Sequence, residues 1–143
     1  MSQYEDDMKF YDQIVYKLLS ESIWSGPIVG TRIFPVVIEQ DVEMPAIAFT
    51  YEVIPVNTKR VYNLMEDVIY NFYCFHNDYE GCMRVTQSIR DTLDRNGQYA
   101  GATGYTTQQW SLVGIDHATY DKDRNLFMIP VIIKAQVQRE FNI

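Results

Sequence analysis

The sequence is poor in cysteine, and it has no long apolar run. Its 143 residues include two cysteines, which provide no disulfide framework in a chain long enough to bury a core without one. We therefore expect a reducing compartment. No stretch approaches the roughly 18 apolar residues of a membrane-spanning helix, and the acidic start, Met-Ser-Gln-Tyr-Glu-Asp-Asp, lacks the apolar stretch of a secretory signal. These absences predict a soluble protein that is not exported and has no membrane partner.

Basic residues are scarce relative to acidic ones. The chain carries 12 Lys and Arg against 19 Asp and Glu, which gives a formal net charge of −7. This charge opposes non-specific binding to phosphate backbones, so a surface that grips DNA is disfavoured. An acidic wall that encloses DNA without gripping it stays compatible with the sequence, because such a wall repels the phosphates and lets the duplex slide.

Apolar and aromatic residues, in contrast, are plentiful. They make up 47% and 14% of the chain, which is enough burial to offset the conformational entropy of folding. The length suits one core, and we find no internal repeat or low-complexity tract. We expect a single domain over residues 1–143.

The spacing of the apolar residues divides the chain into helices and strands. Helical spacing predicts one helix over 4–21, and a second that Asn77 caps and Asn96-Gly97 stops. Alternating patterns predict strands over 31–35, 46–54, 67–75, 105–119 and 126–139. Pro35 favours an edge position for the first strand. This order predicts an α+β fold with a mostly antiparallel sheet of four to five strands and two helices packed on one face.

The residues that most often carry chemistry form no known motif. His76 and His117 lie near no nucleophile motif, and the chain has no Gly-x-Ser-x-Gly elbow. Cys74, His76 and Cys82 lack a fourth ligand for a metal, and both cysteines fall on predicted core positions. We therefore expect no catalytic site, no bound metal and no cofactor.

Two loops resemble ligand-binding loops only in part. The segment 121–125 is similar to the start of a calcium loop, but Leu126 and Ile132 occupy the positions that require Gly and Glu. The glycines of the segment 97–104 do not have the spacing of a phosphate loop, and a strand follows them where a helix is needed. We interpret the first as a charged hairpin turn and the second as a flexible Gly-rich loop.

Tyrosine and tryptophan exceed the needs of one small core. The chain has 11 Tyr and 2 Trp, and these residue types are enriched where proteins meet proteins. Trp24 lies at the exit of the first predicted helix, while Tyr99, Tyr105 and Trp110 lie in or after the Gly-rich loop. We predict self-assembly, although a monomer with extra tyrosines on its rim would show the same composition.

The chain begins with an amphipathic helix, continues with the phrase Gly-Thr-Arg-Ile-Phe-Pro at 30–35, and opens a strand with Met-Pro-Ala-Ile-Ala-Phe at 44–49. A strand at 68–75, a helix at 79–93 and a closing β-hairpin follow. In this layout the whole chain resembles the tail terminator, or tail completion, proteins of long-tailed bacteriophages. The aromatic strand 70–75 and the segment 99–110 have no counterpart in the family pattern.

The resemblance implies a structural virion protein, assembled in the host cytoplasm, at the head-proximal end of the tail. Family members form a hexameric ring on the last ring of the tail tube, stop tube polymerisation and present the surface on which the head docks. The implied partners are other copies of the chain, the tail tube protein and a neck or connector protein. DNA passes through the lumen without specific binding.

A closed ring joins two different patches of each subunit, and these should contain Tyr, Trp or Arg. We predict one patch in the loop 57–63, with Arg60 and Tyr62. We predict the other in the Gly-rich loop together with the hairpin turn, and its residues are Tyr99, Trp110, Lys122 and Arg124.

Three alternative functions are compatible with the residues. A neck or head-completion subunit would share both ring formation and acidity. A monomeric, non-viral binding module would use the groove between sheet and helices for a small ligand. An enzyme would require a carboxylate or histidine with a perturbed pKa in a buried cleft.

Overall fold

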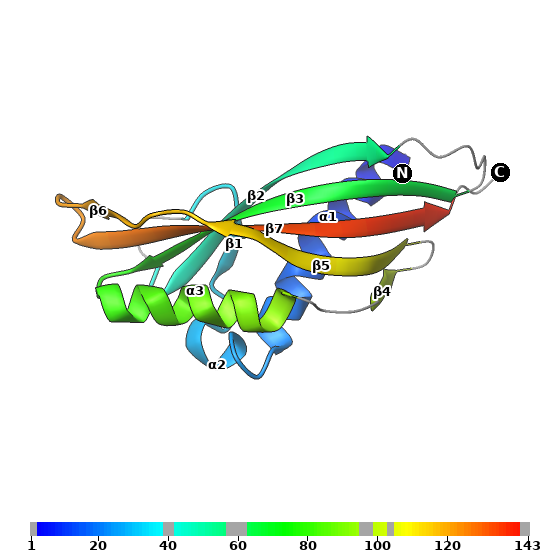
Figure 1. Ribbon diagram of the computed structural model, residues 1–143. Helices are drawn as coiled ribbons and strands as arrows, with labels where there is room; N and C mark the ends of the chain where they lie inside the picture. Colours follow the sequence, from blue (N-terminus) through cyan, green and yellow to red (C-terminus); the bar gives the residue numbers. More distant parts are fainter. Residues whose placement is uncertain (1–2, 39–41, 57–62, 95–98, 103–104, 141–143) are drawn as a thin grey trace.

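The computed structural model describes residues 3–38, 42–56, 63–94, 99–102 and 105–140, which form one sheet and the helices that cover it (Figure 1). The elements, in chain order, are α1 (Gln3–Glu21), α2 (Gly26–Val29), β1 (Ile33–Pro35), β2 (Ala46–Val56), β3 (Asn63–His76), α3 (Tyr79–Leu93), β4 (Tyr99–Ala102), β5 (Tyr105–Ile115), β6 (Thr119–Asp121) and β7 (Leu126–Glu140). The predicted α+β class is confirmed.

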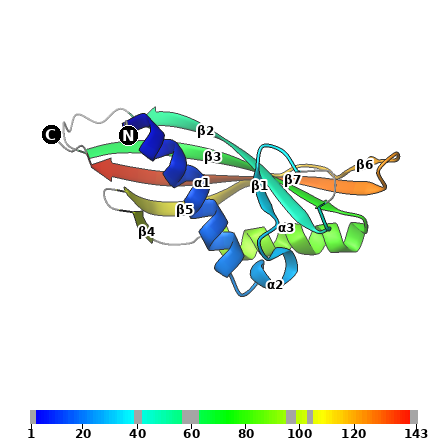
Figure 2. The same ribbon diagram turned by 180° about the vertical axis from the view of Figure 1, so that it is seen from behind.

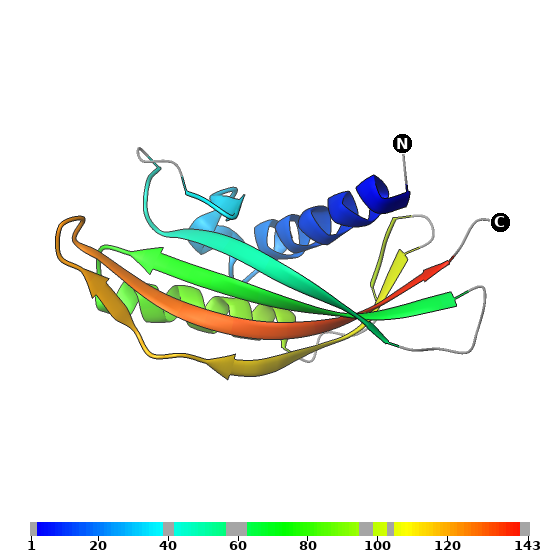
Figure 3. The same cartoon turned by 90° about the horizontal axis from the view of Figure 1, so that it is seen from above.

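Strands β3 and β7 form the centre of the sheet and pair along their whole length, from Asn63↔Glu140 to His76↔Phe127. The order across the sheet is β1-β2-β3-β7-β5-β4. Strand β6 pairs with the first residues of β7. Every pair is antiparallel except β1 with β2. The short β1 lies at the edge, as Pro35 predicts. Long strands twist, and the sheet is strongly curved when seen from above (Figure 3).

The helices lie on one face of this sheet, as predicted. Figures 2 and 3 show α1 and α3 on the same side, and Figure 2 shows α2 just after the end of α1. Alternate residues of β3 point into the core under these helices, among them Val68, Tyr70 and Phe72, each with 0% exposure. The described strands number seven, more than the four to five predicted, because β4 and β6 are additional short strands.

Helix α1 is held by an apolar stripe. Phe10, Ile14, Val15 and Leu19 are buried at helical spacing, and each buried side chain of this kind contributes about 1.5–3 kcal/mol. The chain turns sharply after the helix, where a Cβ on Gly26 would lie 2.7 Å from the carbonyl oxygen of Ser20. Glycine is therefore required at this close approach.

The capping of α3 differs from the prediction. The N-cap is Asp78, whose carboxylate accepts a hydrogen bond from the Gly81 amide at 3.3 Å. Asn77, the predicted cap, instead donates from its side chain to the carbonyl oxygen of Asn125. At the other end Asp94 adopts an extended conformation. The predicted stop at Asn96-Gly97 lies outside the described residues.

Two further expectations are corrected around β5. Residues 99–102, expected within a flexible loop, form the edge strand β4, and they pair with β5 from Tyr99↔Thr107 to Ala102↔Tyr105. The single strand expected over 105–119 is divided into β5 and β6. The residues between them, 116–118, are exposed, and the Asp116 amide donates to the carbonyl oxygen of Pro130 at 3.0 Å.

Candidate assembly surfaces

The predicted interface residues lie in different parts of the structure. Arg60 and Tyr62 lie outside the described residues. Tyr99 opens the edge strand β4. Lys122 and Arg124 are exposed in the turn between β6 and β7. Trp110 is in the core.

Trp110 has no surface available to another subunit. Its side chain is 0% exposed and stacks on Tyr70, with ring centroids 5.6 Å apart and planes 20° apart. Tyr70 in turn donates a hydrogen bond to the backbone carbonyl of Tyr11, so the stack ties β5 and β3 to α1. The prediction of an interface role for Trp110 is corrected, because this tryptophan fills the centre of the helix-covered face.

The Gly-rich segment and the hairpin turn do not form one patch. Thr107, which pairs with Tyr99 of β4, also pairs with Val137 near the end of β7. Asp121 pairs with Leu126 at the start of that strand. The two segments therefore lie at opposite ends of the sheet, as the positions of β4 and β6 in Figure 1 show.

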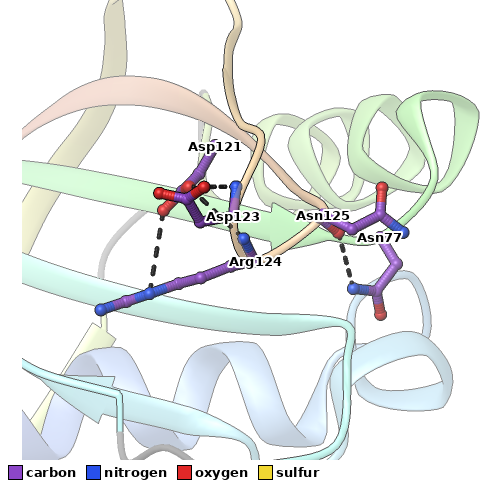
Figure 4. Close-up of polar contacts among 5 residues, drawn as sticks. All are labelled: Asn77, Asp121, Asp123, Arg124 and Asn125. Carbon is purple, nitrogen blue, oxygen red and sulfur yellow. Dashed lines mark hydrogen bonds and ion pairs between the residues drawn. The ribbon is translucent and has the colours of Figure 1, made fainter.

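The hairpin turn is ordered by its own polar groups (Figure 4). The carboxylate of Asp121 accepts hydrogen bonds from the amides of Asp123 at 3.0 Å and Arg124 at 3.4 Å. Arg124 Nε lies 3.8 Å from Asp121 Oδ2, and both side chains are largely exposed. An exposed pair at this distance contributes little to stability, so it leaves Arg124 able to meet a carboxylate of another molecule.

An aromatic surface lies at the same end of the molecule. Phe127 contacts the rings of Tyr120 and Tyr79, with centroids 4.6 Å and 5.6 Å apart. Tyr79 and Met83, which lie one turn apart on α3, are both exposed. Tyr and Met are residue types enriched at protein interfaces. We name Tyr79, Met83, Tyr120 and Phe127 the distal aromatic patch.

A groove lined by both apolar and polar groups lies beside β1 and β2. It encloses about 890 Å³. Its floor contains Ala48 and Tyr73, which belong to the sheet face opposite the helices, and its outer wall contains Val36 and Val37. Glu43 and Arg124 lie on its rim. We name it the β1–β2 groove.

The outer wall of this groove is strained. Val36 has a φ of 69°, a left-handed conformation that β-branched residues rarely adopt and that costs on the order of 1–3 kcal/mol. Its amide donates to the carbonyl oxygen of Phe49 at 2.8 Å, and the Val37 amide donates to that of Pro35 at 2.8 Å. These bonds hold Val36 and Val37 at 69% and 66% exposure.

A second exposed apolar feature lies on the turn between α1 and α2. Ile23 is 78% exposed and Trp24 is 51% exposed. The turn below them is fixed, because the hydroxyl of Ser22 hydrogen-bonds that of Thr92 on α3 at 2.7 Å and accepts a bond from the Trp24 amide at 3.1 Å. The two side chains, which we name the Ile23–Trp24 pair, are therefore displayed on a rigid base.

The cysteines are structural. Cys74 and Cys82 are buried, and the Cys82 thiol donates to the carbonyl oxygen of Cys74 at 3.1 Å. Burial raises the pKa of the Cys82 thiol to about 11 and also raises the pKa of Cys74. Thiols with such pKa values are poor nucleophiles at neutral pH.

The histidines are bound locally. His76 Nδ1 accepts a hydrogen bond from the Asp78 amide, and the exposed His117 lies against its neighbour Asp116. Within the described ranges no group of three His, Cys, Asp or Glu side chains is placed to hold a metal ion. None of the helices described here is both long and apolar enough to span a membrane.

One carboxylate has a perturbed pKa. Burial raises the pKa of Asp12, and a hydrogen bond with Tyr51 partly opposes this shift. Asp12 borders a shallow hollow of about 240 Å³ between α1 and β1. Its remaining described lining, which is Gln13, Tyr16, Ile33, Pro35 and Phe49, provides no second carboxylate, histidine, lysine or cysteine. Tyr16 is the other titratable side chain in this lining.

Sequence reasoning missed the β1–β2 groove. The signal available was the run Pro-Val-Val-Ile at 35–38, because apolar residues that continue past a short edge strand have no predicted partner. The Ile23–Trp24 pair was visible in part, since Trp24 stood at the exit of a helix. The residues of neither feature follow a periodic pattern that would predict their exposure on the surface.

Comparison with known proteins finds similarity in fold among solved structures. No family model and no curated protein matches the sequence. Among solved structures, the fold is similar to that of a chain in the virion of a native gene transfer agent particle, with a TM-score of 0.67 and 14% sequence identity. The match covers 87% of this chain and 91% of that chain. The two chains share a fold over nearly their whole length.

Proposed function

We propose that this chain is a structural virion protein, a tail terminator that caps the tail tube as a hexameric ring. In this role it stops tube polymerisation, forms the surface on which the head docks and lets DNA pass through its lumen. Its partners are other copies of itself, the tail tube protein and a neck or connector protein. The role is structural and not catalytic.

The observation that carries this proposal is the shared fold with a chain from a virion. It agrees with the resemblance to tail terminators that the motifs at 30–35 and 44–49 indicated. That resemblance rested on the order of helices and strands along the chain, and the structural match extends over 87% of the chain. Both observations support a virion protein.

The surfaces fit a ring subunit. The Ile23–Trp24 pair and the β1–β2 groove are different surfaces that both expose apolar side chains, and a closed ring needs two different surfaces on each copy. The net charge of −7 suits a lumen that must pass DNA without binding it. Large exposed apolar side chains gathered in this way mark association sites more often than free surface.

Native mass spectrometry of the purified chain tests the proposal. We expect a dominant species of six times the 16.8 kDa subunit mass. Tail tubes added to the protein should become labelled at one end, and tubes assembled in its presence should be shorter. Binding of the protein to the head side of the neck, and not to the tail tube, would favour a head-completion subunit. A monomer that tail tubes do not recruit would contradict both and favour a binding module.

A further inference from the structure

We propose that the contact between neighbouring copies in the ring is made by inserting the Ile23–Trp24 pair of one copy into the β1–β2 groove of the next. This inference rests on the proposed ring function, and it names the partner of two surfaces of this chain. Its occupant is a second copy of the same chain.

Both halves of the contact expose large apolar side chains. Ile23 and Trp24 protrude at 78% and 51% exposure, while the groove is bordered by Val36 and Val37 at 69% and 66%. Tyr73 lies on the groove floor and offers an aromatic surface to an incoming ring. Tryptophan in a pocket is the typical anchor of a protein interface, because it buries a large area at a small entropic cost.

The Ile23–Trp24 pair cannot enter the groove of its own chain. In Figures 1 and 2 the turn between α1 and α2 lies at the bottom of the molecule, below the sheet. The segment that follows β1 rises at the top, on the other side. The Ile23–Trp24 pair must therefore enter a groove on another copy. A contact between two different surfaces is heterologous, and it closes into a ring when its rotation permits.

The charges around the two surfaces are complementary. Arg124 and Glu43 both line the groove. The Ile23–Trp24 pair follows Glu21, which is exposed at the end of α1. Docking pairs Glu21 with Arg124. This pairing offsets part of the repulsion between copies that each carry a net charge of −7.

The groove is shaped in advance of binding. The positive φ of Val36 and the two amide hydrogen bonds around it turn Val36 and Val37 outward at the edge of the sheet. The Ser22–Thr92 hydrogen bond fixes the opposite surface. Because both surfaces are already in position, association orders few additional side chains.

Disulfide trapping tests the geometry directly. The double variant Ile23→Cys, Val37→Cys keeps Trp24, and the native thiols of Cys74 and Cys82 are buried, so they contribute little background. Mild oxidation should produce a ladder of covalent oligomers that ends at the closed ring on a denaturing gel. Each single variant should stay monomeric on the same gel.

Charge reversal tests the pairing of Glu21 with Arg124. Each of the variants Glu21→Arg and Arg124→Glu should raise the protein concentration at which the ring half-dissociates by about tenfold, the effect of roughly 1.4 kcal/mol. The double variant should return this concentration to the wild-type value. Trp24→Ala should raise the concentration further. Tyr79→Ala removes an aromatic side chain of similar exposure from the distal aromatic patch and should leave the concentration unchanged.

The outcomes separate the contact from the proposed function. If the wild type and Trp24→Ala form equally stable rings, and the double cysteine variant gives no covalent ladder, the contact is overturned while the ring function stands. A wild-type chain that remains monomeric and yields no ladder would overturn both. The contact would be established if the ring weakens in Trp24→Ala and in each single charge reversal, and if the double charge reversal regains the wild-type stability.

Discussion

The carboxylate of Asp94 accepts a hydrogen bond from the backbone amide of Leu112 at 2.9 Å, which joins the end of α3 to β5. Strand β4 pairs with β5 only over 105–107, so the Leu112 amide lies beyond the reach of that edge strand. An unpaired amide on a strand edge is a site for unwanted strand pairing. Asp94 thus stabilises the fold and protects an edge.

Replacing this carboxylate should weaken the fold. We expect Asp94→Ala to lower the free energy of unfolding by about 1–3 kcal/mol, because the partly buried Leu112 amide loses its acceptor. Asp94→Asn retains an acceptor oxygen and should cost less. Urea unfolding measures both variants, and equal losses in the two would show that the hydrogen bond is not the cause.

Trp110 should be a determinant of stability and not of association. Trp110→Ala should lower the free energy of unfolding by about 3–5 kcal/mol, since it empties a fully buried site beside Tyr70. Trp110→Phe keeps the stack and should cost less. A variant that unfolds at the wild-type denaturant concentration but fails to assemble would restore the interface role that the sequence suggested.

The two thiols should be inert in the folded protein. At pH 8, below the pKa of about 11 that burial gives to Cys82, a thiol reagent should label neither cysteine within minutes. After denaturation it should label both cysteines of the chain. Rapid labelling of the native protein would mean that α3 opens from β3 more readily than its buried contacts imply.

Asp12 should make stability depend on pH. Because burial raises its pKa above the ordinary value of 3.8, the folded state holds the proton more tightly than the unfolded state. This contribution stabilises the fold at low pH and is lost as pH rises from about 3.8 through the raised value. Asp12→Asn removes the titration and should gain stability over the wild type as pH rises through that window.

Thermal unfolding of Asp12→Asn and the wild type at pH 3 and pH 7 checks this prediction. The advantage of the variant should be larger at pH 7. Asp123→Asn in the exposed hairpin turn is the matched control, and its difference from the wild type should be the same at both pH values. An Asp12→Asn advantage that is larger at pH 3 would reverse the sign and contradict the burial of this carboxylate.

Periodicity predicted the long elements well, because burial against a single core dictates it. The predicted helix over 4–21 is α1, and the predicted strands over 46–54 and 67–75 are β2 and β3 with small extensions. The helix face of the sheet followed from the same alternation. These are features that local pattern and one core determine together.

The predictions that were wrong concern features that depend on contacts between residues distant in the chain. Asn77 satisfied the capping pattern, but its partner Asn125 comes from the hairpin turn, and Asp78 caps the helix instead. Trp110 had the residue type of an interface anchor, and only the position of Tyr70 shows that it belongs to the core. The lining of the β1–β2 groove includes Val36 in a left-handed conformation, which no sequence pattern predicts.

The central claim is a ring through which DNA can pass, and electron microscopy of the purified protein tests it most directly. The account predicts six-fold class averages with an open channel wider than the roughly 20 Å of duplex DNA, a width consistent with the groove dimensions of the B-form helix. Closed particles, or rings with a channel too narrow for the duplex, would contradict it.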